Sequence, residues 1–202
     1  MRQNTGQISD QAKISLRGEL RARRIELSST LRHRHDQAIG QHLYQLVKYH
    51  GAESFACYWP FDGEPDITPV YRRLMAEGCK LALPVVSEGD DHGMLFHSWR
   101  VDTELVKNRY GIPEPHNTGA IPLSSLDMLM MPLVGYDQSG NRLGMGAGYY
   151  DRCLESIHDL ATPLRVGIAY SVQKTDPIVK NKWDIPLHGV VNEHGWFTFV
   201  GE

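Results

Sequence analysis

The chain has 202 residues, a formal net charge of −3 and 41% hydrophobic residues, which is sufficient for one α/β domain with a full core. The small negative charge argues against a protein that binds nucleic acid through bulk electrostatics, and the three separated cysteines indicate neither a disulfide framework nor a cysteine zinc site. Because the N-terminus is polar and no apolar run approaches membrane-spanning length, the expected location is the cytoplasm, without membrane contact.

Two helices are predicted before the first strand. Residues 1–8 are expected to be disordered, and Ser9 or Asp10 is then the candidate N-cap of a helix that runs to about residue 27. Residues 28–30 cap a second helix, which runs to about residue 49. Four cationic residues lie on one side of the first helix, and the simplest interpretation is a solvent-exposed surface. A nucleic-acid-binding surface is disfavoured because no aromatic residues lie between these cations. These cations are Lys13, Arg17, Arg21 and Arg24.

Short, continuously apolar segments alternate with helical ones along the rest of the chain. The predicted strands are residues 54–59, 80–86, 94–99, 128–134, 165–169, 189–192 and 196–200. Helices are expected at residues 68–77, with Pro69 at the first helical position, and at residues 152–160. This alternation predicts a three-layer α/β/α sandwich around a mostly parallel sheet, as a single domain over residues 1–202.

The loop after the first predicted strand carries Glu64. Loops at the carboxyl ends of strands line the ligand crevice of open α/β sheets, so Glu64 is a candidate functional residue, with an exposed loop acid as the alternative. Further along, Pro113 and Pro115 flank Glu114 and hold the backbone extended. Residues 107–115 are therefore interpreted as a rigid wall of the pocket, with a purely structural turn as the other interpretation.

The segment that carries the strongest functional signal is 141–152, which reads Asn-Arg-Leu-Gly-Met-Gly-Ala-Gly-Tyr-Tyr-Asp-Arg. Three glycines at alternate positions leave one side of residues 144–148, here called the glycine loop, without Cβ atoms, so that backbone N–H groups and the following helix end can approach a phosphate. The loop matches neither a P-loop nor a Gly-x-Gly-x-x-Gly turn, and a glycine-rich turn without a ligand is the alternative. Asp151 would stand beside a bound polyphosphate and suggests Mg²⁺, unless it is an ordinary first-turn acid.

Arg-Leu-Gly-x-Gly-x-Gly-Tyr-Tyr-Asp-Arg, preceded by an apolar strand and Gly135-Tyr136-Asp137, resembles the signature of the 5-formyltetrahydrofolate cyclo-ligase family, whose members are also called methenyltetrahydrofolate synthetases. The resemblance covers nearly the whole chain and agrees with the predicted fold. It implies an ATP- and Mg²⁺-dependent ring closure of 5-formyltetrahydrofolate to 5,10-methenyltetrahydrofolate, with release of ADP and phosphate. The implied intermediate is a phosphorylated formyl group, an iminium phosphate.

The resemblance also implies roles for individual residues. Charge neutralisation in catalysis is assigned to Lys13, Arg17 and Arg142. Nucleotide binding is assigned to Lys13, Arg17, Arg142, Leu143, Gly144, Met145, Gly146, Ala147, Gly148, Tyr149 and Tyr150. Folate contacts are assigned to Arg17, Trp59, Glu64, Met145, Gly146, Ala147, Gly148 and Tyr149, with Phe61 as the alternative to Trp59. Asp151 and Asp184 are the expected Mg²⁺ ligands, and Asp176 is a rival for the second position.

The sequence departs from the family at Met145 and Ala147, where some relatives carry Arg or Lys, so more phosphate binding is expected from the N-terminal helix. Two other classes stay open. A dinucleotide or nucleotide-sugar enzyme is disfavoured by the missing acidic ribose-binding residue, and a regulatory module could bind nucleotide or folate without turnover. The expected partners are the small molecules 5-formyltetrahydrofolate and ATP, the expected state is a monomer, and neither nucleic acid nor membrane is an expected partner.

Overall fold

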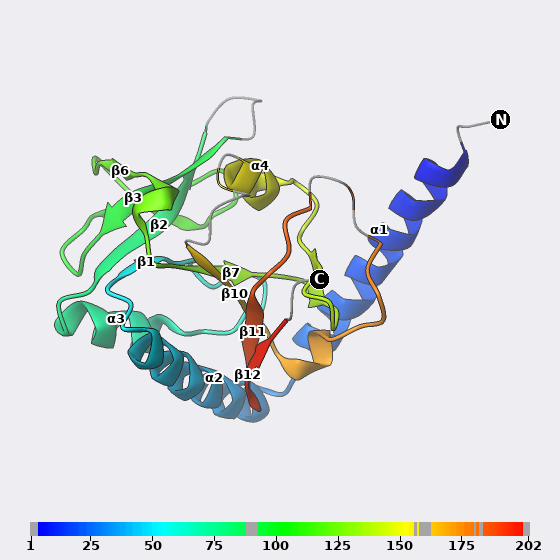
Figure 1. The fold of residues 1–202 in the computed structure, drawn as a ribbon, viewed down its shortest axis with the longest axis horizontal. Coiled ribbons are helices and arrows are strands. Elements are labelled where there is room, and N and C mark those ends of the chain that lie inside the picture. Colours follow the sequence, from blue (N-terminus) through cyan, green and yellow to red (C-terminus); the bar gives the residue numbers. More distant parts are fainter. Residues whose placement is uncertain are drawn as a thin grey trace.

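A mixed sheet forms the centre of the protein in the computed structural model, which describes residues 4–87, 93–155, 157, 163–179, 181 and 184–199. Its strand order is β12-β11-β10-β7-β1-β2-β3-β6 (Figure 1). The five central strands run parallel: β11 (Gly189–Asn192), β10 (Leu164–Ile168), β7 (Met128–Pro132), β1 (Ser54–Ala56) and β2 (Lys80–Val86). The outer strands are antiparallel to their neighbours: β12 (Gly195–Thr198), β3 (Met94–Trp99) and β6 (Ala120–Ile121).

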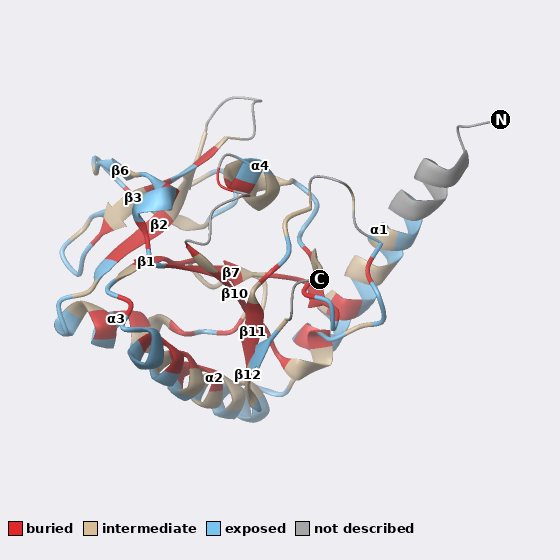
Figure 2. Ribbon diagram, in the orientation of Figure 1, coloured by how far each residue is buried: buried red, intermediate tan, exposed pale blue. Residues whose placement is uncertain are grey.

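Helices cover both faces of this sheet. Helices α2 (Ser29–His50) and α3 (Thr68–Ala76) pack on one face, and the short α4 (Tyr149–Glu155) packs on the other, as Figure 1 shows. Because successive strand residues point to opposite faces, Met128 and Met130 of β7 join the core under α2, whereas Leu129 and Met131 join the core under α4. Figure 2 shows the resulting band of buried residues through the sheet. The predicted three-layer sandwich around a mostly parallel sheet is confirmed.

Helix α1 (Asn4–Ile25) lies beside the end of the sheet toward which β7 runs (Figure 1). Its Leu20 packs with Val134, Leu143 and Ile178. Gly135 permits this contact, since a Cβ atom there would stand 2.4 Å from Leu20 Cδ1. The helix therefore rests directly on the hairpin of β8 (Gly135–Tyr136) and β9 (Arg142–Leu143), which leads into the glycine loop.

Local sequence signals account for several element boundaries. Ser28 Oγ accepts a hydrogen bond from the backbone N–H of Leu31 at 3.3 Å and caps α2, and Gly51, with φ 61°, ends that helix in the left-handed conformation. Pro69 occupies the first turn of α3, as predicted. Strands β2, β3 and β11 coincide with the predicted segments 80–86, 94–99 and 189–192.

Other boundaries differ from the sequence-based expectation. Helix α1 includes residues 4–8, for which disorder was predicted, and ends at Ile25 rather than near residue 27; residues 1–3 lie outside the described residues. Helix α4 begins at Tyr149 rather than at residue 152, because the Arg152 N–H already donates to Gly148 O at 3.1 Å. The predicted helix ran to residue 160, and its residues 156 and 158–160 lie outside the described residues. Strand β1 ends at Ala56, three residues early. None of the helices among the described residues is long and apolar enough to cross a membrane.

The hairpin of β4 (Leu105–Lys107) and β5 (Pro113–Pro115) was expected only as a wall or turn. It is tied to the sheet by Glu114, whose carboxylate accepts hydrogen bonds from Val86 N at 3.0 Å and from Asn108 Nδ2 at 2.7 Å. Strands this short carry no periodic pattern that sequence analysis could detect.

Candidate functional site

The glycine loop and the loop that carries Glu64 lie at the same edge of the sheet. Strands β1 and β7 are parallel neighbours. Residues 57–67, here called the Glu64 loop, leave the carboxyl end of β1, and the segment that reaches the glycine loop leaves the carboxyl end of β7. This edge is where open α/β sheets place their ligands.

The three glycines of the loop have different structural reasons. Gly146, with φ 107°, and Gly148, with φ 71°, adopt backbone conformations that L side chains rarely reach. A Cβ atom on Gly148 would also stand 2.7 Å from Arg152 Nη1. Gly144 has neither constraint, because no described atom lies within 4 Å of its ideal Cβ position. Backbone conformation therefore explains Gly146 and Gly148, whereas a close approach by a ligand would explain Gly144.

Arg17 crosses the glycine loop from helix α1. Its Nε donates to Gly144 O at 2.9 Å, although the two residues are 127 positions apart in the chain. Its Cζ lies 3.5 Å from the ideal Cβ position of Gly146. One helical turn earlier, Lys13 Nζ lies 3.6 Å from Asp184 Oδ2, with only 12% of the lysine side chain exposed. The helix thus brings both predicted cations to the predicted phosphate site.

Two carboxylates, Asp151 and Asp184, lie close enough to interact through their charges, and Asp184 is the partner of Lys13. Burial is the largest cause of the raised pKa of Asp151, and the negative charge of Asp184 raises it further, while Arg142 opposes the shift. The buried guanidinium of Arg142 donates to Asp151 Oδ1 and to Ile185 O. Asp176, the rival predicted from sequence, is exposed. Of these two acids, Asp184 is the one whose charge acts on Asp151.

The donor set of this pair is suited to a hard divalent cation. Carboxylate oxygens are the ligands that Mg²⁺ prefers, and a Mg²⁺ site commonly uses only one or two carboxylates together with phosphate oxygens and water. Among the described residues, no group of three or more His, Cys, Asp or Glu side chains is arranged to hold a metal ion. Asp151 and Asp184 would thus form a partial site that a polyphosphate completes.

Glu64 lies half-buried in its loop, close to residues of the glycine segment. Phe61 N donates to Glu64 Oε2 at 3.1 Å, and Glu64 N donates back to Phe61 O at 3.0 Å. Burial raises the pKa of Glu64 to about 7, against the opposing charge of Arg24. Burial also raises the pKa values of Tyr58 and Tyr150, and the charge of Glu64 adds to both shifts, so the three side chains are neighbours. Because Tyr150 follows the glycine loop, the two loops meet at Glu64.

The aromatic candidates of the Glu64 loop differ in exposure. Trp59 packs edge-on against Trp99, with ring centroids 5.9 Å apart, and is a partly buried residue at the edge of the hydrophobic core. Phe61 is 45% exposed. Either ring remains available to an apolar ligand surface, so the choice between them stays open.

Tyr149 is held by the β4–β5 hairpin, a contact that sequence analysis missed. Its hydroxyl accepts a hydrogen bond from Arg109 Nη2 at 2.8 Å and lies 2.9 Å from Tyr110 Oη. The predicted wall of the pocket therefore reaches the glycine segment through Arg109 and Tyr110. The only sequence signal for this contact was the position of both residues in the block 107–115.

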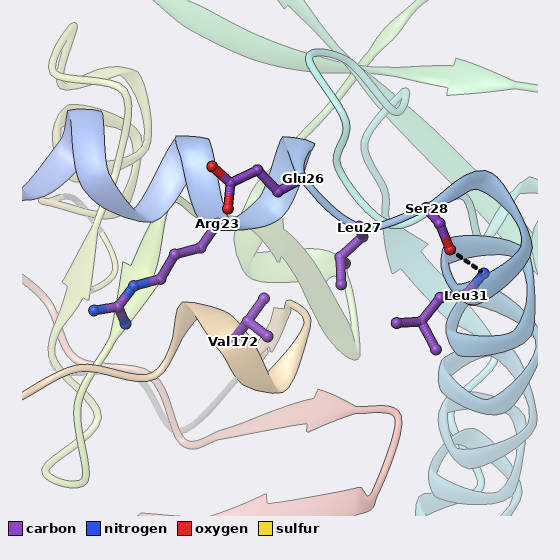
Figure 3. A pocket seen from close by; sticks show the side chains of 6 residues that line it. All are labelled: Arg23, Glu26, Leu27, Ser28, Leu31 and Val172. Atoms are coloured by element: carbon purple, nitrogen blue, oxygen red, sulfur yellow. Dashed lines mark hydrogen bonds between the residues drawn. The ribbon is translucent and has the colours of Figure 1, made fainter.

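Of the remaining predicted residues, some support the glycine loop by packing and others are exposed on its surface. Leu143 is buried against α1, and Tyr150 packs against Phe96 with ring centroids 6.5 Å apart, so both support the loop. Met145 and Ala147 are exposed. A separate surface pocket of about 580 Å³ lies at the junction of α1 and α2 (Figure 3), and none of the predicted site residues lines it.

These features define the class of protein. A glycine loop contacted by Arg17 of a distant helix, a pair of neighbouring carboxylates and a loop with a half-buried acid all lie at the carboxyl edge of a parallel sheet, where open α/β enzymes bind their ligands. The model of the 5-formyltetrahydrofolate cyclo-ligase family matches residues 9–193. The chain belongs to this family.

Individual relatives agree over most of the chain. It is 33% identical over 186 residues to a 5-formyltetrahydrofolate cyclo-ligase of Haemophilus influenzae, covering 91% of this chain and 99% of the relative. It is 39% identical over 142 residues to the protein of the same name from Escherichia coli, covering 69% and 78%. An NMR structure of Aquifex aeolicus 5,10-methenyltetrahydrofolate synthetase superposes with a TM-score of 0.81 at 31% identity, covering 94% of each chain. The Mycoplasma pneumoniae synthetase gives 0.73 at 26% identity, covering 90% of this chain and 98% of the other.

Proposed function

We propose that the protein uses Mg–ATP to close the ring of 5-formyltetrahydrofolate, giving 5,10-methenyltetrahydrofolate, ADP and phosphate. Membership of the family supports the folate reaction. The use of ATP is supported by one structural observation, the contact of Arg17 with Gly144, which lie 127 residues apart in the chain. It brings a guanidinium to a glycine loop, which is a recurring way to bind phosphate.

The chemistry explains why the site needs cations and alignment. A formamide oxygen is a poor leaving group, so the γ-phosphoryl group is transferred to it: the bond to ADP breaks and a new P–O bond forms. N10 of the folate then attacks the formyl carbon, the C–O bond breaks, phosphate leaves, and the N10 proton passes to solvent. Neither step requires a protein nucleophile, because positioning and charge neutralisation dominate phosphoryl transfer.

The phosphate-binding role falls to three cations and the loop backbone. Arg17 contacts the loop, Lys13 pairs with Asp184, and the buried Arg142 pairs with Asp151. Asp151 and Asp184 would hold Mg²⁺, which supplies further neutralisation of the phosphate charge. The residues fit this role because their like charges already interact and are balanced by Arg142 and Lys13.

The folate-binding role falls to the Glu64 loop and Tyr149. A carboxyl group with a pKa of about 7 exists in both protonation states near neutral pH, so Glu64 can donate to or accept from the polar edge of a pterin. Trp59 or Phe61 offers an aromatic surface for the ring. Tyr149 lies at the end of the glycine loop, where the two substrates would meet.

The test is a direct assay. Purified protein mixed with 5-formyltetrahydrofolate and Mg–ATP should produce methenyltetrahydrofolate absorbance, and omission of ATP or chelation of Mg²⁺ should abolish it. Asp184→Asn should lose most of the rate and require more Mg²⁺, whereas the exposed matched control Asp176→Asn should retain both. Turnover without ATP, or equal metal titrations for the two variants, would contradict the proposal.

A further inference from the structure

Arg24 is a charged residue in an unusual place, because its side chain is 0% exposed. From helix α1 its Nη1 donates to Leu133 O at 3.3 Å. Its Nη2 donates to Asp62 O at 2.8 Å and to Asp62 Oδ2 at 2.9 Å. A buried charge of this kind is retained only where its partners hold it.

These contacts join the three segments that carry the proposed site. Leu133 directly follows β7 and begins the segment that leads to the glycine loop. Asp62 lies in the Glu64 loop, two residues before Glu64. Helix α1 itself carries Lys13 and Arg17. One guanidinium therefore links the nucleotide segments to the folate segment.

The turn that Arg24 holds is conformationally demanding. Asp62, with φ 51°, is one of two non-glycine residues in the described part of the chain with positive φ, and Gly63 follows with φ 77°. Such a conformation persists where surrounding contacts impose it. Arg21 also donates to Asp62 Oδ2, at 2.8 Å, but its side chain is 41% exposed and, in the described part of the chain, its hydrogen bond to Asp62 reaches only the carboxylate. Arg24 is the residue that also holds the Asp62 backbone.

We propose that Arg24 is a positioning residue: it holds the Asp62–Glu64 turn in the conformation that presents Glu64 to the folate, and it makes that conformation depend on the packing of α1. This inference rests on the proposed function. Arg24 does not act on the reacting atoms; it acts through Glu64.

The charge of Arg24 provides a readout that a purely structural role would not move. Glu64 is surrounded by Arg24 from α1, Asp62 from its own loop, Tyr58 after β1 and Tyr150 from α4. Burial raises the pKa of Glu64, and Arg24 is the largest opposing influence. Removing Arg24 should therefore raise the pKa of Glu64 further and shift the pH profile of kcat/KM for folate toward alkaline pH.

The experiment compares Arg24→Met with Arg23→Met. Arg23 is adjacent in the chain, 45% exposed, paired with Glu19 of its own helix, and borders the separate surface pocket of Figure 3. In Arg24→Met we expect KM for 5-formyltetrahydrofolate to rise by about tenfold or more, with KM for ATP changed by less than about threefold. Arg23→Met should match the wild type in both constants and in pH profile.

Two further variants keep the test decisive if Arg24→Met does not fold. Arg24→Lys retains the charge and should show an intermediate KM for folate. Asp62→Asn leaves α1 intact, tolerates the left-handed conformation and loses the ion pair, so it should also raise KM for folate. Hydrogen exchange at residues 60–66 should be faster in each of these variants than in Arg23→Met.

The outcomes separate the inference from the proposed function. If wild-type protein turns over the folate but the folded Arg24 and Asp62 variants keep wild-type KM values, pH profile and exchange rates, the positioning role is wrong and the function stands. If wild-type protein neither binds nor converts 5-formyltetrahydrofolate, the proposed function fails and the inference fails with it.

Discussion

Replacing Glu64 with glutamine should stabilise the protein at alkaline pH. Burial raises the pKa of this carboxyl from its ordinary value of 4.5 to about 7. The native state then binds the proton more tightly than the unfolded chain, so the contribution of Glu64 to the free energy of unfolding is greatest below pH 4.5 and decreases as the pH rises to about 7. Above that pH the full cost of the buried charge is present.

The two pKa values set the size of the effect. Their difference corresponds to a cost of about 3 kcal/mol at pH 8 and about 1 kcal/mol at pH 5. Glutamine carries no charge and retains an oxygen that can accept the Phe61 N–H now bonded to Glu64 Oε2. Glu64→Gln should therefore exceed the wild type in free energy of unfolding by up to these amounts, with the larger gain at pH 8.

Urea unfolding at pH 5 and pH 8 provides the measurement. The comparison must be made between variants, because His188, whose pKa is lowered to about 4 by burial and Arg165, makes wild-type stability increase with pH in part of the same range. Glu104→Gln, at an exposed site, is the matched control and should change stability equally at both pH values. A Glu64→Gln variant that is less stable than wild type at pH 8 would show that the carboxylate is favourably held in its ionised form, and the reasoning would be refuted.

Three further predictions concern Lys13 and the glycine loop. Lys13→Ala should raise KM for ATP by about tenfold or more while the fold is retained, as circular dichroism would show; saturation at wild-type ATP concentrations would contradict the role of Lys13. Gly144→Ala should leave the free energy of unfolding within about 0.5 kcal/mol, because no described atom lies within 4 Å of the new Cβ, yet raise KM for ATP; an unchanged KM would favour a glycine-rich turn without a ligand. Gly148→Ala should lose about 1–2 kcal/mol of stability because position 148 has a left-handed backbone conformation. A free energy of unfolding in urea equal to that of the wild type would show that the loop can adopt another conformation.

Much of the fold could be predicted from the sequence because the signals are local. Strands β2, β3 and β11 each have a neighbouring strand on both sides in the sheet, so their sequences contain short apolar runs bounded by turn residues, and the predicted ranges agree with the structure. The caps at Ser28 and Gly51 likewise depend on neighbouring residues. Helix α1 begins earlier than predicted because backbone hydrogen bonds continue a helix beyond the sequence pattern that marks it.

The chemistry of the site was predicted as residue types, and its arrangement was not. The glycine loop, the acid at 151 and the cations at 13 and 17 were identifiable from their spacing and from the family signature. Only the tertiary structure placed Arg17 on Gly144, paired Asp184 with Asp151 and exposed Asp176. It also brought Arg109 to Tyr149 and buried Arg24 against Asp62.

The physical reason is the range of each interaction. Hydrogen-bonded turns, caps and side-chain alternation act over a few residues, so the sequence by itself determined the longer strands of the main sheet, most of the helices and the backbone freedom of the glycine loop. The pKa of Glu64 and the contacts of Arg17 and Arg24 depend on which surfaces the chain packs together. Those surfaces come from segments up to 127 residues apart, and only folding decides which of them meet.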